Sequence, residues 1–153
     1  MAANLVNFVL SLVALAIFLV ILQVDVGPLY WFPLVLISQF ALCLGLSLLV
    51  SSLNVFYRDV EHLVNVILLA WFFVSPVMYT LSFIQENERL GPLVGYYMLN
   101  PMAGVVVAYR TMLISSDPIN GALLIAPFAL CWAVLGVGLV VFSRLERRFG
   151  DEL

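Results

Sequence analysis

A short polar island between two long apolar stretches constrains the fold of this chain more than any other feature. The island reads Asn54-Val55-Phe56-Tyr57-Arg58-Asp59-Val60-Glu61-His62. Hydrophobic residues make up 65% of the chain and charged residues 10%, whereas soluble domains carry about 25% charged residues. A helix needs about 20 apolar residues to cross the roughly 30 Å hydrocarbon core of a bilayer. The pattern therefore predicts an integral membrane protein with a water-facing segment between two spans.

The apolar runs predict an all-α membrane fold, because a helix satisfies its own backbone polar groups inside the bilayer. The chain is expected to form one transmembrane domain over residues 1–153, with four spans at about 5–24, 33–50, 60–78 and 120–142. Asp59 is predicted to cap the third span, with Glu61 in its first turn. Pro76 is predicted to kink that span near its far end.

Residues 93–114 are predicted to form a re-entrant helical hairpin. Asn100-Pro101 reads as a helix cap followed by proline at the first helical position. A helix of about 14 residues, at roughly 1.5 Å per residue, reaches only about 21 Å and is too short to span. If residues 93–114 do not cross, Arg58 and the arginines of the tail share one face, which the positive-inside rule makes cytoplasmic. Both termini are then inside.

Three motifs in order resemble the permease subunit of ABC-2 type exporters, and the nearest branch exports lipid-linked O-antigen, capsule or teichoic acid polysaccharides. The motifs are Leu44-Gly45-Leu46 through Asn54-Val55-Phe56-Tyr57-Arg58-Asp59-Val60, then Trp71-Phe72-Phe73-Val74-Ser75-Pro76-Val77-Met78-Tyr79, then Leu99-Asn100-Pro101-Met102-Ala103-Gly104. Family permeases have six spans, so the resemblance implies that this chain corresponds to the part from the third span onward and lacks the first two.

The resemblance implies a multi-pass protein of the bacterial cytoplasmic (inner) membrane that exports an undecaprenyl-linked glycan. It implies a homodimer, with a second copy of the permease, bound to ABC ATPase subunits. The chain contains no lysine, so it cannot supply the P-loop lysine that binds ATP phosphates. We therefore expect no cofactor on this chain and ATP hydrolysis by a partner. Membrane lipid is an expected contact, and no basic stripe suits nucleic acid.

The polar island is the candidate ATPase-coupling loop, and its alternative interpretation is a solvated turn. The coupling candidates are Asn54, Tyr57, Arg58, Asp59 and Glu61. His62 is the only histidine, which excludes a metal site built from several histidines. Cys43 and Cys131 fall inside apolar runs without metal-ligand spacing and are expected to be packing residues.

The hairpin and the end of the third span are the candidate pore region. Its residues are Ser75, Pro76, Tyr96, Tyr97, Asn100, Pro101, Tyr109 and Arg110. An arginine in an apolar run faces a cavity, pairs with an acid or snorkels to the interface. Arg110 is expected either to attract an anionic group in the pore or to snorkel. The tyrosines offer rings to sugars, or they form an interfacial belt.

Two other functions fit the sequence. One is an ABC-2 permease for a drug or another hydrophobic molecule, and the other is a membrane scaffold subunit that transports nothing. An enzyme is not expected, because no paired carboxylates or activated nucleophile converge within the spans.

Overall fold

The chain is helical throughout the residues that the computed structural model describes, which are 2–23, 29–57, 59–80, 83–84, 91–113 and 121–152. No strand occurs within these ranges, so the all-α prediction is confirmed for them. Arg58 lies outside the described residues, and the side chains of Arg147 and Arg148 are also not described.

Each segment that the sequence predicted to be helical contains a helix among the described residues. They are α1 (Ala2–Ile21), η1 (Leu29–Trp31), α2 (Phe32–Phe56), α3 (Val60–Val74), η2 (Gly91–Leu93), α5 (Val94–Tyr97), α6 (Pro101–Leu113) and α7 (Ala122–Glu152). By length and composition, Phe32–Phe56 and Ala122–Glu146 can cross a membrane, while Val6–Ile21 and Val60–Val74 are shorter apolar helices. The count of four spans remains a prediction.

Proline positions explain where several helices begin and end. Pro33 occupies the first turn of α2, and Pro101 is the first residue of α6. The predicted kink at Pro76 is wrong, because α3 ends at Val74, four residues before the expected end of that span. A residue before proline is disfavoured in the helical conformation. Ser75 accordingly adopts an extended backbone with φ −83° and ψ 147°, so Pro76 terminates the helix.

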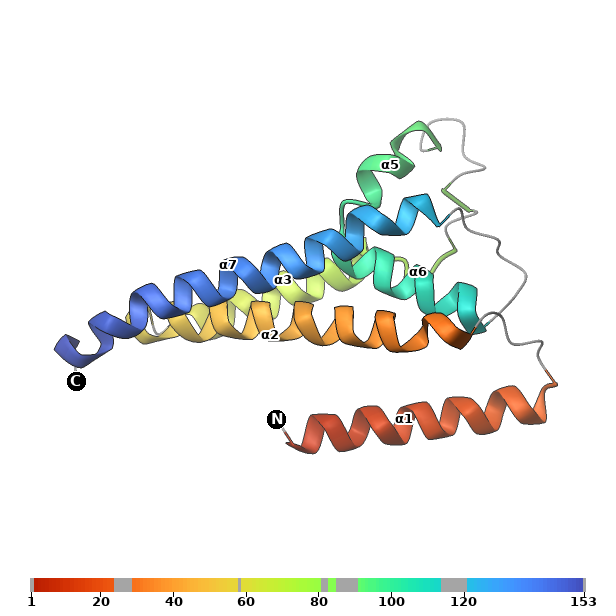
Figure 1. Cartoon of the computed structure of the whole chain (residues 1–153), viewed down its shortest axis with the longest axis horizontal. Helices are drawn as coiled ribbons and strands as arrows, with labels where there is room; N and C mark the ends of the chain where they lie inside the picture. The colour runs from red at the N-terminus through yellow and green to blue at the C-terminus, as the bar shows by residue number, and fades with distance from the viewer. Residues whose placement is uncertain are drawn as a thin grey trace.

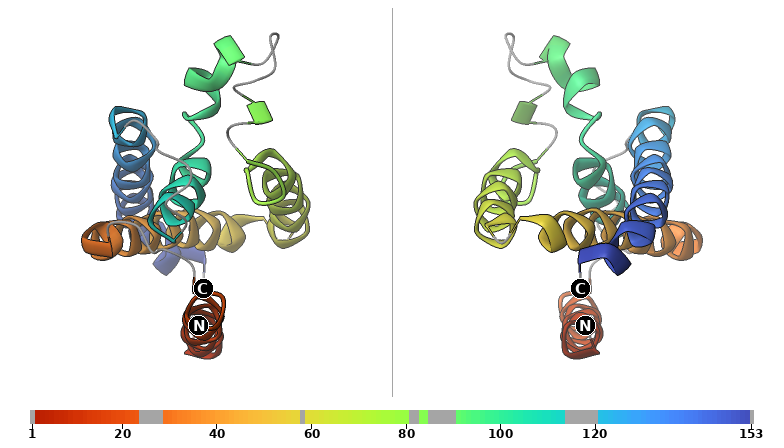
Figure 2. Two further views of the ribbon diagram at one scale, coloured as in Figure 1. Left: turned by 90° about the vertical axis from the view of Figure 1, so that its right-hand side faces the viewer. Right: turned by 90° about the vertical axis from the view of Figure 1, so that its left-hand side faces the viewer.

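The helices form an elongated bundle with α1 beside it. Figure 1 shows α2 and α7 running in one direction and α1 and α3 in the opposite one. The connection between α2 and α3 and the end of α7 lie together, and we call this the loop end. The hairpin of α5 and α6 lies toward the opposite end. Figure 2 shows α6 above α2, between α3 and α7, with α1 on the other side of α2.

The main contact in the bundle is a close approach of two backbones, α2 and α7. A Cβ atom added to Gly45 would lie 2.7 Å from backbone atoms of Leu135 and Val134. A Cβ added to Gly138 would lie 2.6 Å from the carbonyl oxygen of Gly45. Small residues at such positions permit close helix packing in membranes, where association depends on van der Waals contact. The two glycines therefore allow the α2–α7 contact.

A second close contact attaches α6 to α7. A Cβ added to Gly104 would overlap the ring of Pro127, which lies inside α7. Cys131, one turn further along, is fully buried beside α6, as expected for a packing residue. The surrounding core cluster contains Val35, Leu42, Val105, Ala108, Met112 and Cys131. This cluster joins α2, α6 and α7.

Replacing either contact glycine with alanine should destabilise the bundle. The new methyl group meets backbone rather than a flexible side chain, so the helices must separate, and such overpacking costs about 1–3 kcal/mol. We expect Gly45→Ala and Gly138→Ala each to lower the melting temperature of the chain purified in detergent.

Gly136→Ala is the matched control on α7, because no atom lies within 4 Å of its added Cβ. Alanine favours a helix interior over glycine by about 0.5–1 kcal/mol, so this variant should be as stable as the wild type or more stable. Equal stability of all three variants would contradict the backbone contact.

Candidate functional site

The polar island covers the end of α2, a short connection and the first turn of α3. Tyr57 follows α2 in an extended conformation, and its backbone N–H donates to the carbonyl of Leu53 (3.0 Å). Asp59 lies at the N-cap position of α3, as predicted, but its side chain makes no capping hydrogen bond and its backbone is helical, with φ −83° and ψ −5°. A capping residue normally has a non-helical backbone. Glu61 lies in the first turn of α3, where the helix dipole favours a carboxylate.

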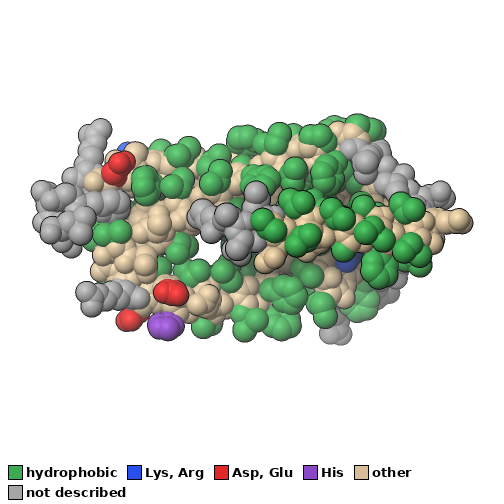
Figure 3. Space-filling view, turned by 90° about the horizontal axis from the view of Figure 1, so that it is seen from below, with side chains coloured by type: hydrophobic (Ala, Val, Ile, Leu, Met, Phe, Trp, Pro, Cys, Tyr) green, Lys and Arg blue, Asp and Glu red, His purple; other side chains and the backbone are tan. Residues whose placement is uncertain are grey.

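Four of the five predicted coupling residues lie together at the loop end. Asn54, Tyr57, Asp59 and Glu61 are all exposed, and the fifth, Arg58, lies outside the described residues. On the face shown in Figure 3, acidic side chains and the histidine lie at this end, and apolar side chains dominate the remainder. An exposed polar surface suits both a protein contact and a solvated turn, so the coupling role remains a prediction.

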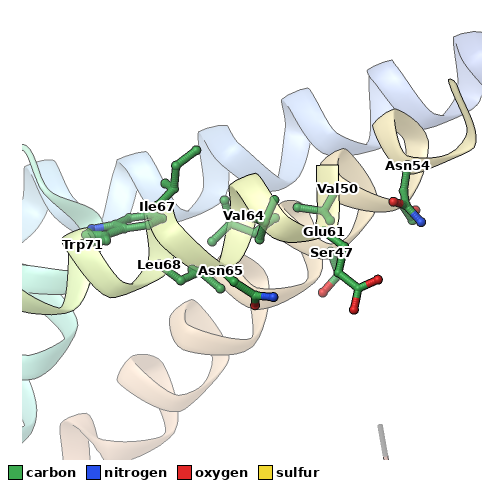
Figure 4. A pocket seen from close by; sticks show the side chains of 11 residues that line it. Ser47, Val50, Asn54, Glu61, Val64, Asn65, Ile67, Leu68 and Trp71 are labelled. Atoms are coloured by element: carbon green, nitrogen blue, oxygen red, sulfur yellow. The ribbon is translucent and has the colours of Figure 1, made fainter. Parts of the chain in front are cut away.

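A cleft of about 480 Å³ separates α2 from α3. Its volume falls within the roughly 300–1,000 Å³ of typical ligand sites. The lining residues are Leu46, Ser47, Val50, Ser51, Asn54, Glu61, Val64, Asn65, Ile67, Leu68 and Trp71. Figure 4 shows Asn54 and Glu61 toward the loop end of the row and Trp71 at its inner end. The lining of the cleft thus runs from Asn54 and Glu61 near the loop end to Trp71 at the other end of the row.

Asn100 fastens the turn of the hairpin to the end of α3. Its Oδ1 accepts the indole N–H of Trp71 (2.7 Å) and the backbone N–H of Met102 (3.1 Å). Its Nδ2 donates to Oγ of Ser75 (3.2 Å), and that hydroxyl donates to the carbonyl of Trp71 (2.9 Å). The predicted cap at Asn100 is confirmed by the Met102 bond. The same side chain also joins two helices.

Two tyrosines converge on the last carbonyl of α3. The hydroxyls of Tyr79 and Tyr97 lie 2.9 Å and 2.8 Å from the Val74 oxygen and 2.6 Å from each other. Two hydroxyls supply only two protons for these three contacts. One tyrosine hydroxyl can therefore donate to the Val74 carbonyl while the other donates either to the same carbonyl or to the first hydroxyl. Tyr96, by contrast, is 74% exposed.

Arg110 and Tyr109 bind different parts of the bundle. A guanidinium nitrogen of Arg110 donates to the carbonyl of Tyr79 (2.8 Å), and the Tyr109 hydroxyl donates to Oε1 of Gln39 (2.7 Å). The sequence predicts that Arg110 faces a cavity, pairs with an acid or snorkels, whereas in the structure its partner is a backbone carbonyl. The bond attaches α6 to the segment after α3, and the pore role of Arg110 remains a prediction.

The structure also identifies residues that the sequence-based site omitted. Trp71, Gln39 and Tyr79 each supply a hydrogen bond between segments. A signal was present for Trp71, because a buried indole N–H in an apolar run needs an acceptor. Ser75 and Pro76, predicted pore residues, are buried at the junction of α3 and the hairpin.

The buried polar side chains of the described residues are paired within the chain. No group of three or more His, Cys, Asp or Glu side chains among them is placed to hold a metal ion. Each buried side-chain nitrogen or oxygen in this part of the chain has a hydrogen-bond partner. Some of these groups, including Asn100, Tyr109 and Arg110, hold separate segments together.

Comparison with known proteins gives consistent matches. A family model described as ABC-2 type transporter matches residues 1–114. The O-antigen export system permease protein RfbA of Myxococcus xanthus is 29% identical over 98% of this chain and 57% of its own length. A protein of the same name from Klebsiella pneumoniae is 26% identical over 82% of this chain and 46% of its own length. The chain thus spans about half the length of these curated relatives. No solved structure matches it.

The tyrosine pair gives a test of how the hairpin is held. Tyr97→Phe and Tyr79→Phe should each cost about 0.5–1.5 kcal/mol of stability, since one hydroxyl remains for the Val74 carbonyl. The double variant removes both donors, so we expect a loss greater than the sum of the single losses. Thermal unfolding in detergent provides the measurement.

Tyr96→Phe, the exposed neighbour, is the control and should change stability by less than about 0.5 kcal/mol. Additive losses, or a Tyr96 effect equal to that of Tyr97, would show that the pair does not share the carbonyl.

Proposed function

This chain belongs to the ABC-2 type transporter family, and we propose that it is a permease that exports a lipid-linked polysaccharide. The observation that carries the proposal is its alignment, over 98% of its residues, with a protein named as an O-antigen export permease. The helical architecture agrees, because the two long apolar helices α2 and α7 both pack against α6 of a hairpin that is joined to α3 by side-chain hydrogen bonds.

The energy for export comes, in this proposal, from a separate ABC ATPase. The chain has no lysine for a phosphate-binding loop, and its described interior offers no group left without a partner. The ATPase would dock at the loop end, against Asn54, Tyr57, Arg58, Asp59 and Glu61. Support comes from the exposure of the four described members of this set at one end of the bundle.

The hairpin is proposed to line the exit side of a pathway completed by a second copy of the permease in the bacterial cytoplasmic membrane. Its helix α6 has 13 residues, or about 20 Å, which is too short to cross. It carries Arg110, whose positive charge suits the pyrophosphate of an undecaprenyl-linked glycan. The hydrogen bonds of Asn100 and Arg110 hold the hairpin in a defined position, and in this proposal the hairpin moves away from that position during export.

A chimera tests the function directly. This chain replaces the matching segment of the Myxococcus xanthus permease in cells that lack that permease, and surface O-antigen is measured. Export of O-antigen is expected, with no accumulation of lipid-linked glycan inside the cell. The intact relative and a version lacking the segment are the positive and negative controls. A chimera that inserts and binds its ATPase but exports no glycan would refute the proposal.

The coupling loop has its own test in Arg58→Glu. Charge reversal at a contact opposes association without altering core packing, so recovery of the ATPase with the chimera should fall about fivefold or more while membrane insertion stays unchanged. Arg58→Lys keeps the positive charge at the same position and should retain the partner. Equal recovery for both variants would leave the polar island as a solvated turn.

A further inference from the structure

Helix α3 is too short to reach from the loop end to the opposite surface of a membrane. It has 15 residues, or about 22 Å, whereas the hydrocarbon core is about 30 Å thick. The helix starts beside the polar island at the loop end, so its other end falls short of the far surface. The chain continues there without helix through residues 75–80, which we call the unwound segment. Irregular backbone therefore lies at membrane depth.

Part of the backbone of the unwound segment has no hydrogen-bond partner in the described chain. The Val77 N–H donates to the Ser75 carbonyl (2.7 Å), and the Tyr79 carbonyl accepts from Arg110 (2.8 Å). No described residue bonds to the N–H or the carbonyl of Met78, or to the carbonyl of Val77. The side chain of Met78 is 77% exposed. Lipid cannot satisfy such groups, and irregular backbone at this depth needs protein or water beside it.

Arg110 brings a second requirement for water to the same place. Its guanidinium carries several N–H donors, and the described residues supply it with one acceptor, the Tyr79 carbonyl. A charged side chain at membrane depth faces a water-filled cavity or a partner of opposite charge. A second protein chain would have to offer acceptors to the guanidinium and donors to the free carbonyls within a few ångströms. Water does both.

We propose that the unwound segment and Arg110 border water within the membrane, in the half away from the loop end. Water bonds to the free backbone groups of Val77 and Met78, and the hydroxyls of a carbohydrate chain can replace it, because they also donate and accept hydrogen bonds. This replacement, which makes the segment part of the export pathway, rests on the proposed function. The contact with water is a property of this chain.

Cysteine accessibility tests for the water. Met78→Cys is made in the full chain with Cys43→Ala, and Cys131 stays because it is fully buried. Membranes are broken open so that reagent reaches both faces. The probes are a cationic and an anionic methanethiosulfonate, trimethylammonioethyl and sulfonatoethyl, which do not dissolve in lipid. Because the reactive species is the thiolate, which requires water, we expect both probes to label Met78→Cys about tenfold or more faster than a lipid-facing control.

Ile37→Cys on α2 is that control. It is 51% exposed and lies in a regular helix that ends at Phe56. The helical rise places it about 28 Å from that end, a distance from the loop end comparable to that of the unwound segment. Equal labelling at the two positions would overturn the proposal. Labelling of Met78→Cys by the neutral, lipid-soluble methyl methanethiosulfonate alone, or by no probe, would also overturn it, since lipid or protein would then cover the segment.

The charge of Arg110 should bias the two probes. A positive charge near the thiol attracts the anionic probe and repels the cationic one, so Arg110→Gln should lower the ratio of anionic to cationic labelling at Met78→Cys about fivefold. Arg110→Lys should keep most of the ratio. Salt at 1 M, which shortens the screening length to about 3 Å, should reduce the ratio in the parent even if Arg110→Gln does not fold. A ratio that neither salt nor substitution changes would show that Arg110 does not border this water.

Export by the chimera tests the link to the pathway separately. After reaction of Met78→Cys with the anionic probe, the chimera should lose most of its export per assembled complex, whereas treated Ile37→Cys should retain it. Labelling without loss of export would show that the water lies outside the pathway. Failure of the untreated chimera would count against the proposed function alone, because the labelling experiment uses this chain without the relative.

Discussion

The structure depends on the direct contact of two helix backbones at Gly45 and Gly138. With no side chain between them, α2 and α7 approach closely enough for Cys131 and Pro127 to reach α6 on the same side. Within a bilayer the lipid tails are as apolar as the side chains, so close packing and hydrogen bonds must replace the hydrophobic effect as the source of association. The hydrogen bonds of Asn100, Tyr97 and Arg110 then fix the orientation of the hairpin relative to α3. The close contacts between helices are made by small residues.

Much of the helical framework could be predicted from local sequence. Long apolar runs located α2 and α7, Pro33 and Pro101 marked the starts of two helices, and the Asn100 cap appeared as expected. These features depend on interactions within a few residues of each other, which a single sequence displays. The polar connection between α2 and α3 was predictable for the same reason. Gly136 and Gly138 lie two residues apart in α7, but only Gly138 faces the partner helix.

The long-range pairs of the site could not be predicted, because they depend on the path of the chain between α3 and α6. Trp71 and Asn100 were both visible as polar groups in apolar surroundings, yet nothing local pairs residues 29 apart. Tyr96 and Tyr97 are adjacent and alike in sequence, but only Tyr97 faces the end of α3. Helix α3 ends early because Pro76 restricts the backbone of Ser75 to a non-helical conformation. The apolar run continues beyond this point, so the apolar pattern alone predicts a longer helix.

The position of α7 in the chain has a consequence for biogenesis. Both close contacts of the bundle, Gly138 on Gly45 and Pro127 on Gly104, are supplied by this last helix. A ribosome has therefore finished α2, α3 and the hairpin before the element that packs α2 against α6 emerges. Until then the small-residue face of α2 is open to other helices in the membrane. The packing of α2 against α6 thus waits for the synthesis of α7, and a chain without α7 would leave Gly45 and Gly104 uncovered.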